Sequence, residues 1–321
     1  MRRTRMVQGA NAAAALLISL GLALSGMAEA RASQWVAAWG SSMQGLAPTT
    51  LTNATVQMIA RSTIAGDAVR VRLENTFGPA PLTIGEAYVG LRNLGVSLVA
   101  GSNRRLTFAG LPSVTIPAGE RVMSDPVALA VEAQQDLAVS LYVPGESVPI
   151  TRHTGALTTS YLTANGAGNH AASEDRSAFT NTTTSMYWLS AIEVFSDSAT
   201  GAIVAFGDSI TDGSCTTLDA HDRWEDLMAL RLLLRPGKDR AVVNDGIGGN
   251  TVTRLNLVPP PDSLPGIERL DRDVLELSGV THSSSSWEPT TSAGRPVPGR
   301  LLPVCRRSSI ESTPGGSRSS G

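Results

Sequence analysis

Several residue types are scarce in this sequence. Aromatic residues make up 4% of the 321 residues, cysteine occurs twice, and Lys238 is the single lysine among 26 basic residues. The two cysteines, Cys215 and Cys305, are too few for a disulfide framework, although one disulfide between them could form outside the cell. A formal net charge of −2 gives no support to nucleic-acid binding. With 42% hydrophobic and 17% charged residues, the composition is still that of a globular protein.

Long hydrophobic runs are also missing, apart from a short one near the N-terminus. Residues 1–32 contain the basic stretch MRRTR, the apolar stretch AAAALLISLGLALSG, and small residues that allow cleavage after Ala30 or Ala32. The apolar stretch is shorter than the ~20 residues of a membrane span. This favours a cleaved signal peptide over a retained anchor. The sequence therefore predicts an exported protein, secreted or periplasmic, with no stable membrane span.

Residues 33–196 have the pattern of short strands. In AVRVRLENTFG, Val69, Val71 and Leu73 alternate with arginines before turn-forming residues end the stretch. SVTIPAG, LAVSLYVPG and MYWLSAIEVFS have a similar character, and no convincing helical stretch interrupts them. We expect an all-β domain of the sandwich or jelly-roll type. His153 and His170 fall in polar, loop-like stretches, and neither is expected to be catalytic.

The pattern changes after residue 200. AIVAF (202–206) is a continuous apolar run typical of a buried parallel strand, and AVVN (241–244) is a second one. A helix is predicted from Asp222, with Glu225 in capping-box spacing, and another is predicted in GIERLDRDVLEL. One face of the first helix holds Trp224, Leu227, Met228 and Arg231. This alternation predicts the start of a doubly wound α/β domain over residues 200–282, in which active groups lie at the carboxyl ends of strands.

Two loops follow these strands at the same end of the predicted sheet. GDSITDG (207–213) places Ser209 where the first strand ends and a helix should begin. A serine there is exposed, and backbone amides at a helix start can stabilise negative charge. GIGGN (246–250) follows the second strand. Gly-Asp-Ser alone is also good turn chemistry, so the pairing of the two loops is the more specific signal.

VAFGDSITDG resembles the first sequence block of the SGNH (GDSL) hydrolases, and VVNDGIGGNTV resembles their second block. The resemblance implies a serine ester hydrolase of the esterase or lipase kind, with Ser209 as the nucleophile. It also implies an oxyanion hole from the amides of Ser209 and Gly249, no metal and no cofactor. The implied fold is a flavodoxin-like parallel sheet, and the implied substrate is a small-molecule or glycan ester. The β-rich first half resembles, less specifically, the N-terminal region of one exported branch of this family.

The other blocks of the family are missing from the sequence. These are a Gly-x-Asn-Asp that supplies an asparagine donor, and a late Asp-x-x-His that supplies the base and its carboxylate. His221 lies in DAH, which has the wrong spacing, and His282 lies at the edge of an atypical segment, so neither is expected to be the base. A serine hydroxyl without a base is a poor nucleophile, and we expect this chain to be inactive or nearly so. A non-catalytic carbohydrate-binding or surface protein, acting through the β-rich half, is the competing hypothesis.

The segment 283–321 begins with SSSSWEPTTS, where the third block should start. If serine is encoded by TCN, reading from the third base of each codon turns each of the first serines into an apolar residue and the Trp-Glu junction into glycine. The following positions then permit a small residue, Asn and Asp. We therefore interpret the chain after about residue 282 as an unstructured, out-of-frame tail on an incomplete sheet, whose helices leave apolar faces uncovered. A genuine tail rich in serine and proline is the alternative. The oligomeric state is not predicted.

Overall fold

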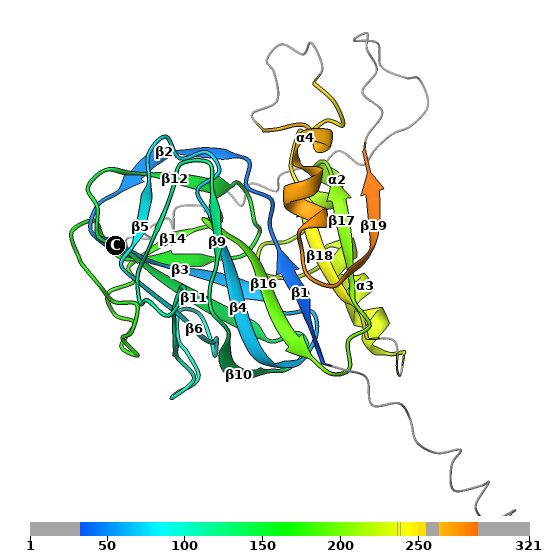
Figure 1. Ribbon diagram of the computed structural model, residues 1–321, viewed down its shortest axis with the longest axis horizontal. Coiled ribbons are helices and arrows are strands. Elements are labelled where there is room, and N and C mark those ends of the chain that lie inside the picture. The colour runs from blue at the N-terminus through cyan, green and yellow to red at the C-terminus, as the bar shows by residue number, and fades with distance from the viewer. Residues whose placement is uncertain (1–32, 236, 238, 255–262, 288–321) are drawn as a thin grey trace, which may run out of the picture.

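The computed structural model describes residues 33–235, 237, 239–254 and 263–287 (Figure 1). Strands account for 44% of the structure and helices for 10%, and the larger sheets are antiparallel. The predicted fold class, an α/β protein with an incomplete flavodoxin-like sheet, is therefore wrong. Among the described residues, parallel strand pairing occurs in one small sheet. Most of the strands belong to the first half of the chain, where they pair antiparallel. The predicted signal peptide, Cys305 and most of the predicted tail lie outside the described residues.

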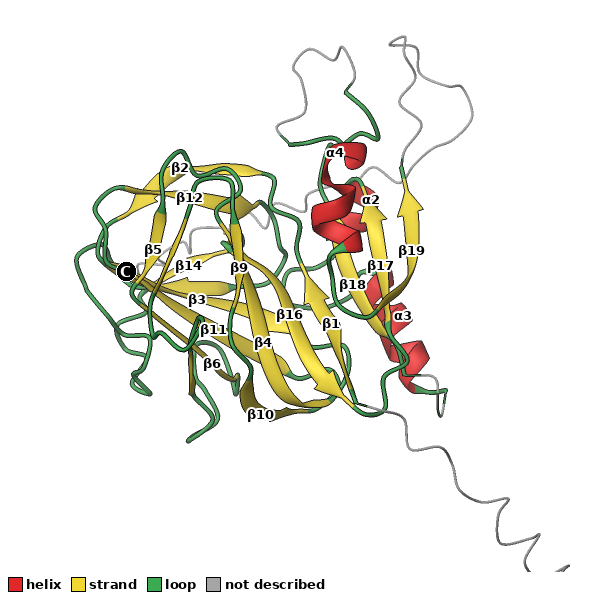
Figure 2. Ribbon diagram, viewed as in Figure 1, coloured by secondary structure: helices red, strands yellow, loops and turns green. Residues whose placement is uncertain are grey.

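One antiparallel sheet lies beside the parallel sheet (Figures 1 and 2). Its order is β1 (Gln34–Gly40), β16 (Leu189–Ser196), β4 (Gly66–Glu74) and β10 (Val127–Val131), and β9 (Arg121–Met123) also pairs with β4. The alternation in β4 buries Val69, Val71 and Leu73 on one face. Arg72 and Glu74 are buried on the other face, where their charged groups lie 3.4 Å apart. The two faces of this strand therefore serve an apolar core and a polar network.

The remaining antiparallel sheets complete the β-rich half. A six-stranded sheet has the order β14 (Asn181–Thr183), β13 (Ser160–Leu162), β3 (Ala54–Arg61), β11 (Asp136–Val143), β6 (Glu86–Leu91) and β7 (Arg104–Leu106). A three-stranded sheet has the order β15 (Met186–Tyr187), β12 (Val148–His153) and β2 (Gly45–Leu51), and β5 (Leu82–Ile84) pairs with β8 (Val114–Ile116). His153 is thus the last residue of a strand rather than a loop residue.

The parallel sheet has the order β18 (Ala241–Gly246), β17 (Ala202–Gly207) and β19 (Val280–Ser286). The two apolar runs of the sequence form β17, the central strand, and β18. The connecting helices are α2 (Ser209–Asp212), α3 (Trp224–Leu233) and α4 (Gly266–Leu270), which continues into the π-helical turn η1 (Asp271–Leu275). No helix in the described ranges is long and apolar enough to cross a membrane.

The first residues of the predicted tail form a strand instead of an unstructured segment. β19 continues through four serines, and Ser285 and Ser286 pair with Phe206 and Gly207 of β17. Its side chains from residue 281 to residue 286 are exposed, so the strand is held through its backbone and needs no apolar face. Trp287 then packs edge-on against Phe206, with 5.5 Å between ring centroids. Residues 288–321 lie outside the described part.

Helix α3 differs from its predicted form in two respects. Its first turn is capped by Asp226, whose carboxylate accepts a hydrogen bond from the Arg223 amide at 3.1 Å, and not by Asp222 and Glu225. Glu225 is buried, whereas Trp224 is 36% exposed and Leu227 46% exposed. The uncovered apolar face expected of a helix on a small sheet is therefore present.

The apolar core is continuous between the two halves of the chain. Val36 of β1, Val204 of β17 and Val243 of β18 are fully buried members of one cluster. β1 runs beside β18 (Figure 1), and the Ala37 amide donates to the carbonyl of Ser278 at 2.9 Å. The parallel sheet is consequently packed against the β-rich half rather than being tethered to it.

Candidate active site

Ser209 lies directly after the central parallel strand, at the first residue of α2. The turn is held by Asp208, whose carboxylate accepts the Ile210 amide at 3.0 Å. The Ser209 carbonyl accepts the amides of Gly213 and Ser214 at 3.1 and 2.8 Å. The Ser209 side chain is half-buried, and its hydroxyl makes no hydrogen bond with any described residue. The hydroxyl is therefore open to an incoming group.

The glycine loop after β18 lies against this turn. A Cβ atom on Gly246 would lie 2.2 Å from the Asp212 nitrogen, so only glycine allows the approach. The Gly248 amide donates to Asp212 Oδ2 at 2.7 Å. Gly249 follows in the left-handed region with φ of +73°, exposed, and its amide has no partner in the described ranges. The structure thus brings the GDSITDG and GIGGN loops together, while the roles of Ser209 and Gly249 stay predictions.

A histidine from the β-rich half also reaches this turn. His153, at the end of β12, is 3% exposed, and its Nε2 lies 3.0 Å from Asp212 Oδ1. Its Nδ1 lies 2.9 Å from the Ser42 carbonyl. Both ring nitrogens therefore face oxygen atoms that can accept a hydrogen bond. No local pattern marks His153, since its partner is 59 residues away in the sequence.

The two histidines nearest the motifs in sequence lie elsewhere. His221 Nε2 is 3.8 Å from Asp136 Oδ1 at the start of β11, and burial is the main cause of its lowered pKa. His282 is exposed, and its Nδ1 lies 2.7 Å from Arg240. None of the four histidines in the chain hydrogen-bonds to Ser209 in the described structure.

A small pocket opens beside the His153–Asp212 pair. It lies where the β-rich half meets α2 and β18. Trp39, Ile59 and Met186 supply apolar walls, and His153, Asp212, Arg223 and Asn244 supply polar ones. Asn244 donates to the Thr211 carbonyl at 2.6 Å, which ties α2 to β18 independently of the histidine.

Arg269 of α4 hydrogen-bonds to both loops. Its side chain is fully buried. Nη2 donates to the Gly207 carbonyl at 2.9 Å, and Nε donates to Asn250 Oδ1 at 3.1 Å. Its guanidinium also stacks over Phe206, 4.1 Å from the ring centroid. Since Gly207 precedes the turn that carries Ser209 and Asn250 ends the glycine loop, one side chain fixes the two loops relative to each other.

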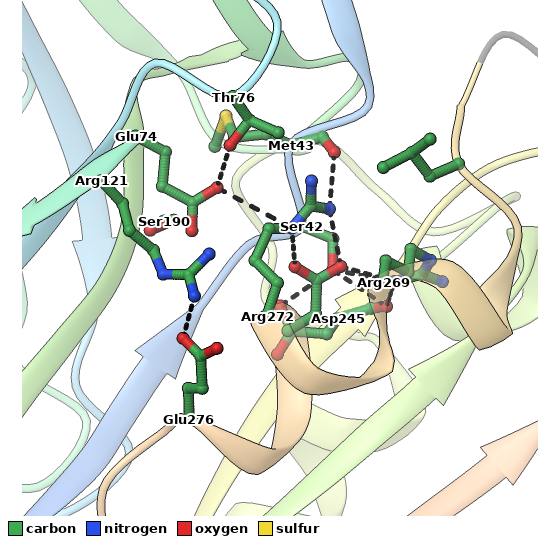
Figure 3. A network of polar contacts seen from close by, with 12 residues as sticks. Ser42, Met43, Glu74, Thr76, Arg121, Ser190, Asp245, Arg269, Arg272 and Glu276 are labelled. Carbon is green, nitrogen blue, oxygen red and sulfur yellow. Dashed lines mark hydrogen bonds and ion pairs between the residues drawn. The ribbon is translucent and has the colours of Figure 1, made fainter. Parts of the chain in front are cut away.

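The same arginine belongs to a buried ionic network between the halves (Figure 3). Arg269 donates a hydrogen bond to the Asp273 carboxylate through Nη1. Arg272 donates to the same carboxylate through Nε and Nη2. Burial alone would raise the pKa of Asp273, but Arg272 and Arg269 hold it below its usual range. Burial, and then the charge of Asp273, raise the pKa of Asp245 well above its usual value. Asp245 thus favours its neutral form, with Oδ1 3.1 Å from the Ser42 hydroxyl.

The network also reaches the antiparallel sheet. Arg272 Nη2 donates to the Met43 carbonyl at 3.1 Å, and its Nε lies 3.9 Å from Glu74 of β4. Among the described residues, no group of three or more His, Cys, Asp or Glu side chains could hold a metal ion. The polar contacts of this region join α4 and η1 to the β-rich half.

Comparison with known proteins gives little beyond this geometry. No family model and no curated protein matches the chain. A family two carbohydrate esterase from Clostridium thermocellum, solved with cellohexaose, aligns with 64% of this chain and 48% of its own at 10% identity and a TM-score of 0.16. A family two carbohydrate esterase from Cellvibrio japonicus aligns with 70% of this chain and 55% of its own at 12% identity and a TM-score of 0.17. The chain spans about half the length of these structures, and TM-scores this low do not establish a shared fold.

Proposed function

We propose that this chain carries the nucleophile and the oxyanion loop of a serine ester hydrolase, with Ser209 as the nucleophile. The observation that carries the proposal is the unbonded Ser209 hydroxyl at the carboxyl end of the central parallel strand, beside the glycine loop of the neighbouring strand. Ligands of parallel sheets bind at this end of the strands. The resemblance of both loops to SGNH hydrolase blocks supports the same reaction.

The reaction follows from the groups in place. Ser209 Oγ attacks the ester carbonyl carbon, and the carbonyl oxygen becomes an oxyanion. The amides of Ser209 and Gly249 donate to it, and such a donor is typically worth on the order of 10² to 10³ in rate. The alcohol then leaves, and water hydrolyses the acyl-serine. The Gly248 amide already bonds to Asp212, so Gly249 is the residue of this loop whose amide is available.

The same geometry limits the rate. No described histidine faces the Ser209 hydroxyl, so its proton must pass to water, and the hydroxyl is weakly activated. The pocket beside the His153–Asp212 pair is lined by neither Ser209 nor Gly249. We therefore propose that this chain reacts only slowly with esters.

Acetylation by p-nitrophenyl acetate tests this function. The purified chain should release p-nitrophenol slowly and gain an acetyl group on Ser209, which peptide mass spectrometry locates. Ser209→Ala should react at the background rate, because the acceptor oxygen is gone. Ser214→Ala is the matched control, since this exposed serine lies one turn further along the same loop. Equal acetylation in wild type and Ser209→Ala would contradict the proposal.

A further inference from the structure

The geometry points to His153 as a positioning residue of the ester-hydrolysing site, contributed by the β-rich half. It acts through Asp212 on the glycine loop, which packs against the turn that carries Ser209. This inference rests on the proposed function and adds to it a role for the first half of the chain. The β-rich half would then be part of the site and not a separate binding module.

His153 is itself rigidly held. It is the last residue of β12, and it pairs with Met186 of β15. Its ring is 3% exposed, and Nδ1 is anchored at 2.9 Å to the Ser42 carbonyl. A buried ring fixed at one nitrogen can present the other nitrogen in only one direction, and that direction is toward Asp212.

The two carboxylate oxygens of Asp212 have different partners, one in the β-rich half and one in the glycine loop. Oδ1 lies 3.0 Å from His153 Nε2, and Oδ2 accepts the Gly248 amide at 2.7 Å. A hydrogen bond to a charged group is shorter and about twice as strong as a neutral one. Loss of His153 would leave Oδ1 without this partner and free the carboxylate to turn away from Gly248.

The consequence would reach the reacting groups. Asp212 shares the single turn of α2 with Ser209, and Gly248 precedes Gly249. A turned carboxylate would release the loop that carries the Gly249 amide. The helix itself should stay in place, because Asn244 donates to the Thr211 carbonyl at 2.6 Å. The expected defect is therefore in the placement of the loop and not in the fold.

Three variants test the inference: His153→Leu, His153→Gln and, as the control, His170→Gln. His170 is half-buried in the same half, and its ring bonds to the Ala167 carbonyl. The first measurement is the rate of Ser209 acetylation by p-nitrophenyl acetate, per folded molecule. The second is amide hydrogen exchange of the peptide that contains residues 246–250, followed by mass spectrometry. Thermal melting reports the folded fraction.

We expect His153→Leu to acetylate Ser209 at least ~10-fold more slowly, since a misplacement of about 1 Å can cost on the order of 10² in rate. Its glycine loop should exchange faster than that of wild type. His153→Gln should recover part of both properties, because its side-chain amide can still donate to Asp212. His170→Gln should match wild type in both.

Wild-type values for His153→Leu in either measurement would overturn the inference while leaving the proposed function intact. A wild-type chain without Ser209-dependent acetylation would instead refute the proposed function, and the role of His153 with it.

Discussion

Glu225 lies in the first turn of α3, on the side that faces β18. It is 3% exposed, and neither carboxyl oxygen is hydrogen-bonded to another described residue. Burial raises its pKa to about 8, and the nearby charges of Asp226 and Asp212 add to the increase. The side chain is consequently neutral at physiological pH, and its ionisation must work against folding.

This gives a pH-dependent prediction for Glu225→Gln, which resembles the neutral acid. The folded pKa of about 8 lies above the ordinary value of 4.5, so stability is complete below the ordinary value and falls as the pH rises toward 8. The variant escapes this loss. It should match wild type near pH 4 and exceed it at pH 8 by up to a few kcal/mol, given about 1.4 kcal/mol per pKa unit. Urea unfolding at several pH values measures the difference, and equal stabilities at pH 8 would show the prediction to be wrong.

Some residues of the candidate site lie in recognisable stretches of the sequence, whereas others reach the site only through the packing of the fold. The two loops that carry Ser209 and Gly249 could be predicted, because each follows an apolar strand, while the roles of these two residues stay predictions. The position of His153 beside them could not, because its partner Asp212 lies in α2 and the contact depends on how the two halves of the chain pack. Arg269 was likewise missed, since a buried arginine in GIERLDRDVLEL is indistinguishable in sequence from an exposed one on an amphipathic helix.

At the scale of elements, α4 and η1 join the parallel sheet to the β-rich half. Arg269→Met should destabilise the chain by about 3–5 kcal/mol, because it leaves the buried charge of Asp273 undercompensated and breaks the bonds to both loops. Arg254→Met is the control. Its partner is Glu268 in an exposed ion pair, and such pairs contribute about 0–1 kcal/mol. Chemical denaturation compares the two, and a similar loss in both variants would contradict the prediction.

The structure differs from the predicted elements in two stretches that are rich in polar residues. β17 and β18 were expected because continuous apolar runs suit buried parallel strands. β19 was not, because a run of serines has no apolar face, and these serines pair with β17 through their backbone groups. The cap of α3 was misassigned because Asp222 instead accepts the Thr217 amide at 2.9 Å and closes the preceding loop. Asp226 was then left to cap the helix.

At the scale of the whole molecule, α3 carries exposed apolar side chains that favour association with other molecules. Leu227 and Leu230 lie one turn apart and are 46% and 45% exposed. The double variant Leu227→Gln and Leu230→Gln should bind less hydrophobic dye and associate less, with little change in stability. Leu94→Gln is the control, because Leu94 is 79% exposed in a loop of the β-rich half. Light scattering and dye fluorescence report the effect, which is refuted if the double variant behaves like the control.

The hydrogen bond between Ala37 and Ser278 joins two segments that are synthesised at different times. The partner of the first described strand is translated near the end of the described chain. While the ribosome is still at work, β1 has its neighbour β16 but lacks the segment that covers its other side. The first half of the chain therefore gains this contact only after residue 278 has been synthesised.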